Sequence, residues 1–437
     1  MTEKASLKQG VGLLSVISLG MGLAVGVSIF SVIAPATALA GPAMLLAVAL
    51  AAVPMFIIAV TYAFMGSALP TAGASYEWPR RFISPLTGFM IAWLRIVGSV
   101  GAMLILALVL TRYLSMVIEV PTKTTMFAVY VLIFGLNLIG VSIAAKVQTV
   151  LMGALVAVFL VFGIWGAPSI QPVNFVPFIS EGWVGVLAAT PLLIGMFFGI
   201  EAATEVGDEV KNSRKAIPIG VAASILSAMA LYLLVAAVSL GVLGADKLAA
   251  SETPVLDAAE VFMGHHIAGP LIIIAAIIAI GKSLNALAMV FSRYLYAMAR
   301  TGALPPALAK IHPKFGTPHI ALAVAFGFCC LGLLAPMNLT ALFLAVNVPT
   351  LLKYGASCFV ATRIAKNHPE IHAQAVFKPS RKAVTIWGWM GVVASGIVVL
   401  LGLTADWKPY VALLIWGAIG ALWYAVRGRF GIVDKEI

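Results

Sequence analysis

The chain has 437 residues, of which 62% are hydrophobic and only 10% are charged, and its mean hydropathy is +1.08. This composition excludes a water-soluble globular protein and indicates a polytopic membrane protein. The formal net charge of +11 does not indicate nucleic-acid binding, because the basic residues lie mainly in short loops between apolar stretches, where they set membrane topology.

Twelve apolar stretches are each long enough to span a bilayer, which takes about 20 apolar residues. In chain order, the predicted spans are residues 12–36, 41–66, 86–116, 124–143, 147–166, 184–209, 216–243, 267–297, 319–335, 339–362, 384–404 and 409–426. No loop between them is large enough for a further domain, although residues 244–266 have room for a short surface helix. The sequence therefore predicts an all-α integral membrane protein with one transmembrane domain over residues 1–437.

The basic residues predict the orientation of these spans. An even number of spans places both termini on one side of the membrane. If the N-terminus is inside, most Lys and Arg residues fall in inner loops and tails, and the outer side keeps only Arg112, Lys123, Lys247 and Lys408. Because inner loops carry the excess of basic residues, we expect a multi-pass protein of the cell (inner) membrane with both termini in the cytoplasm.

Two of the spans contain glycines that an unbroken helix does not favour. The first span reads GMGLAVGVSIF at Gly20–Phe30, and the sixth reads GMFFGIEA at Gly195–Ala202. They lie five spans apart, an odd number, so the second unit enters the membrane in the opposite sense to the first. Corresponding glycine-broken spans of this kind are typical of inverted-repeat transporters, in which the substrate site lies where the two breaks meet.

Three carboxylates follow the break in the sixth span. Glu201, Glu205 and Glu209 are spaced four residues apart, which predicts that they share one face of a helix. Ionisable side chains inside a membrane are costly and are functional candidates by default. For Glu209, near the inner end, we expect an ion pair with an inner-loop arginine such as Arg80 or Arg81.

Four stretches together resemble one family of membrane proteins. GLAVGVSIF at Gly22–Phe30 is similar to a glycine-rich stretch ending GxGIF, and PTAGASYEW at Pro70–Trp78 is similar to a P-x-x-G-G-x-Y loop. Phe197–Pro218 resembles FxGFE…EEVKNPxRxIP, and Ser283–Pro305 with His312–Pro318 resembles SLN…SRxLYAxARDGxLP…HPKxGTP. In this order and spacing, they identify the chain as similar to the amino acid–polyamine–organocation permeases.

The resemblance implies a five-plus-five inverted repeat with broken helices 1 and 6, followed by two C-terminal helices. We place repeat one at about 12–166, repeat two at about 184–362 and the extra helices at about 384–426. It also implies a secondary active transporter of an amino acid or related organic amine that works by alternating access, with proton coupling or exchange. The alternatives are a polyamine or organocation transporter and, less favoured, a transporter of anionic amino acids.

The sequence gives no sign of catalysis, of a cofactor or of an accessory chain. All six histidines fall in loops or at span ends, and no HExxH or phosphate-binding loop is present. The cysteines lie in or beside apolar stretches, so we expect no disulfide to a partner subunit. We therefore expect a protein that is not an enzyme, has no metal or cofactor, and takes a small molecule as its partner within the lipid bilayer.

The predicted substrate site comprises the two breaks. Free backbone N–H groups and the half-helix dipole at the first break suit a carboxylate, although close glycines also mark helix packing. At the sixth span, the resemblance places the unwound point just before Glu201, which either holds freed N–H groups or accepts a substrate ammonium. The candidate substrate-binding residues are Val25, Gly26, Val27, Ser28, Ile29, Phe198, Gly199, Ile200 and Glu201.

A charge network of Lys282, Glu205, Arg95 and Lys353 completes the predicted site. Many relatives carry a lysine in helix five where this chain has Leu155, and Lys282 in helix eight could supply that ammonium for coupling. The alternative is an ion pair of Lys282 with Glu201 or Glu205. For Arg95 and Lys353 we favour pairing with the acids of helix six, while a positive cavity for an anionic substrate stays open.

Overall fold

Helices account for the secondary structure of the described residues, apart from two isolated β-bridges. The computed structural model describes residues 7, 9–26, 28–115, 118–334, 339–402 and 407–432. A helix satisfies all of its backbone hydrogen bonds internally, which is what an apolar stretch requires in lipid. The principal helices are α1 Leu13–Ala24, α2 Ser28–Ser31, α3 Ile33–Ala40, α4 Met44–Ala68, α5 Ala74–Phe82, α6 Pro85–Ser115, α7 Thr122–Leu138, α8 Val141–Gly166, α9 Gly182–Ile194, α10 Ser213–Leu243, α11 Ala245–Ala250, α12 Pro254–Met263, α13 His265–Arg300, α14 His319–Gly332, α15 Leu339–Asn367, α16 Pro369–Gln374, α17 Arg381–Gly402 and α18 Lys408–Val426.

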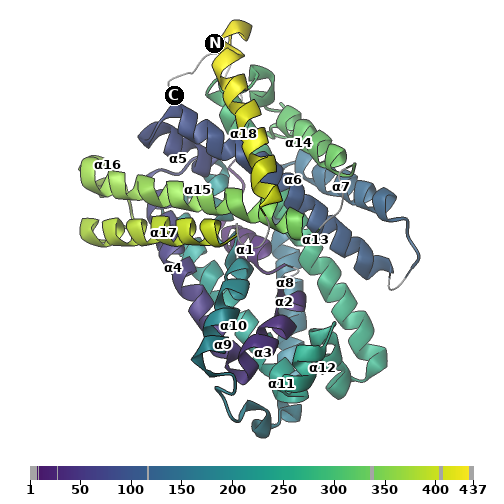
Figure 1. Ribbon diagram of the computed structural model, residues 1–437. Helices are drawn as coiled ribbons and strands as arrows, with labels where there is room; N and C mark the ends of the chain where they lie inside the picture. The colour runs from purple at the N-terminus through teal and green to yellow at the C-terminus, as the bar shows by residue number, and fades with distance from the viewer. Residues whose placement is uncertain are drawn as a thin grey trace.

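These helices follow the predicted spans closely. Within the described ranges, eight helical segments are long and apolar enough to cross a membrane, and α1, α7 and α14 are shorter apolar helices. This confirms an all-helical membrane protein, whereas the count of twelve spans and the inverted repeat stay predictions. Figure 1 shows α11 and α12 at one end of the molecule and the end of α18 at the other, while α15 and α17 lie across the direction between these ends.

The first predicted span is not one helix. Helix α1 ends at Ala24, the next residue leaves helical geometry (Val25, φ −77°, ψ 76°), and α2 starts only at Ser28. Helix α3 then continues the chain from Ile33. The predicted interruption near Gly26 is therefore confirmed.

The sixth span is also interrupted. Helix α9 ends at Ile194, and a short 3₁₀ turn at Gly195–Phe197 leads into extended backbone at Phe198. Gly199 has a φ of +99°, a region that side chains with a Cβ rarely adopt. A Cβ at Gly199 would also lie 2.5 Å from the side chain of Leu23 in α1. The glycine thus allows both the turn and the close approach of the two broken segments.

The part of the sixth span beyond the break differs from the prediction. It consists of two 3₁₀ turns, Ala202–Glu205 and Gly207–Glu209, and not of a regular α-helix. The three glutamates therefore do not share one helical face, and each contacts a different group. The backbone of this part pairs with other segments, through β-bridges of Ala72 with Val206 and of Val11 with Val210.

Backbone hydrogen bonds join the segment before α1 to the segment after the second break. The N–H groups of Gly10 and Val11 both donate to the Glu209 carbonyl oxygen at 3.0 Å, and the N–H of Lys211 donates to the Val11 carbonyl oxygen at 2.9 Å. We call this short paired region the terminal clamp. It ties the start of the first broken helix to the end of the sixth span.

Two loops carry more helix than expected. Part of the Pro70–Trp78 loop forms helix α5, which starts after Gly73 in left-handed geometry (φ 65°). The 244–266 region forms the two short helices α11 and α12 in place of one. Helices α15 and α17 lie alongside one another in Figure 1 and pack closely.

Candidate functional site

A cavity of about 220 Å³ lies between the two helix breaks. Five of the nine candidate substrate-binding residues line it: Gly26 and Ser28 from the first break, and Phe198, Gly199 and Glu201 from the second. Helices α6, α13 and α15 close the remaining sides. The geometry therefore brings the two glycine-broken segments to one site, as the sequence predicted.

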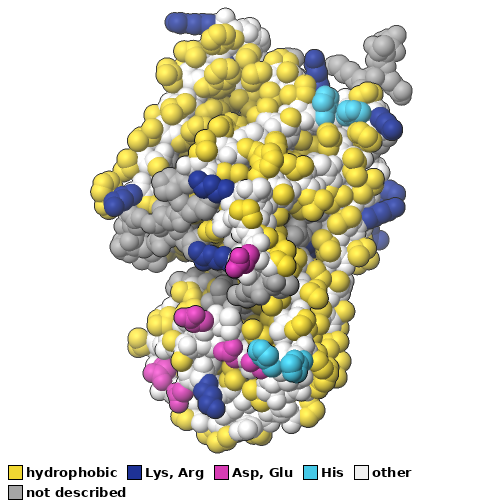
Figure 2. Space-filling model, turned by 90° about the vertical axis from the view of Figure 1, so that its right-hand side faces the viewer, with side chains coloured by type: hydrophobic (Ala, Val, Ile, Leu, Met, Phe, Trp, Pro, Cys, Tyr) yellow, Lys and Arg dark blue, Asp and Glu magenta, His cyan; other side chains and the backbone are white. Residues whose placement is uncertain are grey.

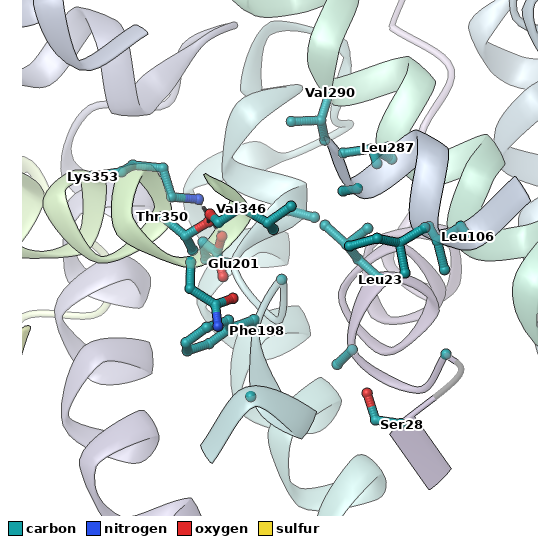
Figure 3. A pocket seen from close by; sticks show the side chains of 18 of the residues that line it. Leu23, Ser28, Leu106, Phe198, Glu201, Leu287, Val290, Val346, Thr350 and Lys353 are labelled. Atoms are coloured by element: carbon teal, nitrogen blue, oxygen red, sulfur yellow. Dashed lines mark hydrogen bonds and ion pairs between the residues drawn. The ribbon is translucent and has the colours of Figure 1, made fainter. Parts of the chain in front are cut away.

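The cavity has an apolar wall and a charged side. Figure 3 shows Lys353 and Thr350 close to Glu201, while the aliphatic side chains of α1, α6, α13 and α15 gather across the cavity. The labelled aliphatic residues are Leu23, Leu106, Leu287, Val290 and Val346. Such a division suits a ligand with one ionic end and one apolar end.

Glu201 is fully engaged by its neighbours on α15. One carboxylate oxygen contacts the Lys353 ammonium, and the other accepts a hydrogen bond of 2.7 Å from the Tyr354 hydroxyl. The Tyr354 oxygen in turn accepts the freed backbone N–H of Gly199 at 3.1 Å. This arrangement matches the structural interpretation of Glu201, a carboxylate that holds the unwound backbone, here through a tyrosine.

Glu205 accepts hydrogen bonds from several neutral donors. Ser75 binds it through the backbone N–H (3.1 Å to Oε2) and through the hydroxyl, and Tyr294 donates to Oε1 at 2.9 Å. The Lys353 ammonium is 3.9 Å from Oε1. Hydrogen bonds to the charged form of a carboxylate stabilise it without a direct counter-ion. Lys353 therefore lies within ion-pair distance of both Glu201 and Glu205, which agrees with the pairing favoured from the sequence.

Arg95 does not pair with the acids of the sixth span. Its Nη1 donates to the Thr350 hydroxyl at 2.6 Å, and its Nε is buried without a hydrogen-bond partner among the described residues. The pairing expected from the sequence is therefore wrong for Arg95 and right for Lys353. The reason is that Arg95 extends from α6 toward α15, where a threonine meets it first.

Lys282 contacts backbone and not carboxylates. Its ammonium donates to the carbonyl oxygens of Gly22 (3.0 Å) and Val25, at the C-terminal end of α1. The Ser283 hydroxyl also donates to the Gly22 oxygen, at 2.7 Å. A cation there complements the negative end of the helix dipole. Of the two readings, the ion pair with Glu201 or Glu205 is wrong, because the side chain points to α1.

The remaining predicted residues lie around this centre. Val25, Ile29 and Ile200 are fully buried and belong to the core at the breaks, and in the described part of the chain they do not line the cavity. Val27 lies outside the described residues. Substrate binding by these four residues stays a prediction.

The predicted partner of Glu209 is wrong. The carboxylate forms a bidentate pair with Arg293, with distances of 2.7 Å and 2.8 Å, and both side chains are fully buried. Arg80 and Arg81 pair with Glu77 instead. These two arginines and Glu77 share the short helix α5, so they meet at local helical spacing.

Sequence reasoning missed two buried tyrosines, one of which connects the breaks. The Tyr232 hydroxyl of α10 lies 2.9 Å from the Ala24 carbonyl oxygen and 2.8 Å from the Met196 carbonyl oxygen, so it touches the last turn before each break. Tyr62 contacts the hydroxyls of Ser75 and Ser357. The available signal was a tyrosine hydroxyl inside an apolar stretch, which needs a hydrogen-bond partner when it is buried.

A helical membrane protein with a central cavity between two broken helices belongs to the class of membrane transporters. The chain belongs to the amino acid permease family, whose model matches residues 11–421. This confirms the resemblance to the amino acid–polyamine–organocation permeases. Members of the family are transporters and not enzymes, and the family implies a small-molecule substrate of the amino acid type.

Individual relatives cover most of the chain. The methylthioribose transporter of Bacillus subtilis (strain 168) is 26% identical over 450 residues, which is 98% of this chain and 95% of the relative. The branched-chain amino acid permease of the same organism is 27% identical over 454 residues, covering 97% and 94%. The human cationic amino acid transporter 4 is 29% identical over 395 residues, covering 83% and 60%. Relatives of this kind differ in the substrates that their names give.

Proposed function

We propose that this protein is a secondary active transporter that carries an amino acid or related organic amine across the cell membrane by alternating access. The observation that carries the proposal is the cavity between the two broken helices, which lies among buried ionisable groups. Discontinuous helices supply unpaired backbone groups to a substrate and let the surrounding bundles move around it. Twelve spans, a five-plus-five inverted repeat and cytoplasmic termini belong to the same proposal.

The distribution of charge supports this orientation. On the face shown in Figure 2, most Lys and Arg side chains lie in the half toward one end and Asp and Glu lie in the other half, although some Lys or Arg side chains lie beside the acids. The basic end is the end at which α18 finishes in Figure 1. Basic residues concentrate on the cytoplasmic side of membrane proteins, so we assign that end to the cytoplasm.

The charges inside the cavity favour a substrate with no net charge. The charged residues that line it are two bases, Arg95 and Lys353, and two acids, Glu201 and Glu205. Their formal charges cancel (+2 and −2), so a zwitterion leaves the low-dielectric site neutral, whereas a polyamine or an anionic amino acid does not. The aliphatic wall fits an apolar side chain, which makes a neutral aliphatic amino acid the first candidate.

Transport by purified protein in liposomes tests the proposal. We expect saturable uptake of labelled L-leucine, stimulated by unlabelled L-leucine inside the vesicles and reduced more by neutral amino acids than by L-lysine, L-glutamate or putrescine. Methylthioribose belongs in the competitor panel because one relative is named for it. Uptake that putrescine or L-glutamate competes best would instead support one of the charged alternatives, and absence of any saturable flux would contradict the function.

Lys282 is the residue that we assign to coupling. Its ammonium links α13 to the end of α1 through two carbonyl oxygens, and its side chain is fully buried. When a buried ammonium loses its proton, its hydrogen bonds to those carbonyl oxygens weaken. Protonation of Lys282 would in this way be coupled to movement of the first broken helix. Such a link fits proton-coupled uptake or exchange.

The Lys282→Ala variant separates coupling from folding. We expect it to abolish net uptake or to change the dependence of uptake on pH, while Lys247→Ala, at an exposed position of α11, behaves like the wild type. Exchange measured in the same vesicles reports whether the variant still binds substrate. Normal net transport with an unchanged pH profile would show that Lys282 has no part in coupling.

A further inference from the structure

Among the residues that the structure describes, Arg95 is the charged residue of the cavity that has no counter-ion in contact. Lys353 contacts Glu201 and lies 3.9 Å from Glu205, and Glu205 has three further hydrogen bonds from neutral donors. No carboxylate of the described residues lies within 4.0 Å of the Arg95 guanidinium. The side chain nevertheless lines the cavity and is only 6% exposed.

The hydrogen bonds of Arg95 leave one edge of its guanidinium unused. Nη1 donates to the Thr350 hydroxyl, and that hydroxyl uses its own proton to donate to the Val346 carbonyl oxygen at 2.7 Å. Thr350 is therefore fixed as an acceptor and sets the orientation of the arginine. Nε is buried and has no hydrogen-bond partner within the described ranges, and a buried donor left without an acceptor destabilises the site.

The unused edge has the geometry that a carboxylate requires. Nε and Nη2 of a guanidinium carry two parallel N–H groups, which match the two oxygens of a carboxylate in a bidentate pair. A hydroxyl or an ether oxygen fills only one of these positions. A substrate carboxylate would satisfy both donors at once and would also give Arg95 the counter-ion that it lacks.

We propose that Arg95 is a specificity-determining residue that binds a carboxylate of the substrate through its Nε–Nη2 edge. This rests on the proposed function, because it assumes that the cavity is the transport site. Figure 3 shows Thr350, the partner of Arg95, across the cavity from Ser28 at the first break. If Arg95 holds the substrate in this way, carboxylate-bearing compounds are preferred over their amine counterparts.

Two carboxylates can occupy this edge, and the experiment distinguishes them. The probes are L-leucine, its decarboxylated analogue isoamylamine, and L-glutamate, with binding measured on purified full-length protein. The variants are Arg95→Lys, which keeps the charge but removes the two parallel N–H groups of the guanidinium, and Arg95→Gln. Arg112→Gln, at an exposed position on the same helix, is the matched control, and thermal unfolding confirms that each variant is folded.

We expect Arg95→Lys and Arg95→Gln to weaken binding by about 10- to 100-fold, the range for lost charge-assisted hydrogen bonds. If the edge holds the α-carboxylate, L-leucine and L-glutamate are weakened together, and isoamylamine, which binds the wild type weakly, is unaffected. If it holds a side-chain carboxylate, only L-glutamate is weakened. Both outcomes support the proposal.

Three outcomes would overturn it. The first is binding of both amino acids by folded Arg95 variants at wild-type affinity. The second is an equal loss for isoamylamine, which has no carboxylate and would show a general defect of the cavity. The third is a wild-type protein that binds no amino acid at all; this defeats the proposed function as well, whereas the first two outcomes leave that function standing.

Discussion

Both helix breaks line the cavity, but they free different backbone groups: carbonyl oxygens at the first break and an N–H group at the second. At the end of α1, free carbonyl oxygens of Gly22 and Val25 meet the ammonium of Lys282. At the second break, the free N–H of Gly199 reaches the carboxylate of Glu201 through Tyr354. A cation thus serves the carbonyl end of one helix and an anion serves the N–H group of the other, as helix polarity requires.

The difference is that, in the described part of the chain, only the second break holds a complete ion pair. Glu201 has Lys353 as its direct counter-charge, whereas Lys282 contacts neutral carbonyl groups alone among the described residues. The second break therefore depends on two mutually compensating charges, and the first on one charge and two dipoles. Substitution of Lys353 and of Lys282, one at a time, should reveal this difference as a difference in the stability of the folded protein.

The largest effect is expected for Lys353→Met, because it removes the counter-ion of the buried Glu201 and the ammonium that lies 3.9 Å from Glu205. Removal of one partner of a buried pair costs about 3–5 kcal/mol. The double variant Lys353→Met with Glu201→Gln removes both charges and should recover much of this loss. Thermal unfolding of the purified proteins measures both, and a double variant as unstable as the single one would contradict the pairing.

A smaller effect is expected for Lys282→Met. The lost hydrogen bonds from a charged donor are worth about 1.5–3 kcal/mol, but the variant also removes a buried ammonium whose burial is unfavourable. The net loss should therefore be no more than about 1–2 kcal/mol in the same unfolding assay. If Lys282→Met unfolds as readily as Lys353→Met, the first break depends on charge as strongly as the second.

The smallest effect is expected for Tyr232→Phe, which touches both breaks without any charge. Loss of one neutral hydroxyl that contacts Ala24 and Met196 should cost about 0.5–1.5 kcal/mol, with the aromatic packing against Phe197 preserved. Tyr130→Phe is a matched control, since its hydroxyl is buried without a partner in the described part of the chain. Equal stability of the two variants would show that Tyr232 does not connect the breaks.

The spans and the breaks could be predicted because both depend on local sequence. Apolar length predicted helices such as α10 and α13 to within a few residues at each end, and glycines predicted the breaks near Gly26 and Gly199. The regular helix expected after Glu201 was wrong, since backbone pairing with the segments around Val11 and Ala72 replaces helical hydrogen bonds there.

Partner choice between distant helices was harder to predict. The sequence placed Lys353, Arg95 and Lys282 inside the membrane but gave no distances between helices. Lys353 was assigned correctly to the acids, while Arg95 meets Thr350 and Lys282 meets backbone carbonyls, which no charge pattern reveals. The pair of Glu209 with Arg293 was missed for the same reason, because 84 residues separate the two in the chain.

The terminal clamp has a mechanical consequence. Three backbone hydrogen bonds, from Gly10, Val11 and Lys211, hold the start of the first broken helix against the end of the sixth span, beside the buried pair of Glu209 and Arg293. The two broken segments are therefore held together at this end as well as at the breaks, where Tyr232 contacts both. Under the proposed alternating-access function, we expect a substrate to leave past this end only after these three hydrogen bonds have broken, so that their rupture adds to the barrier of the transport cycle.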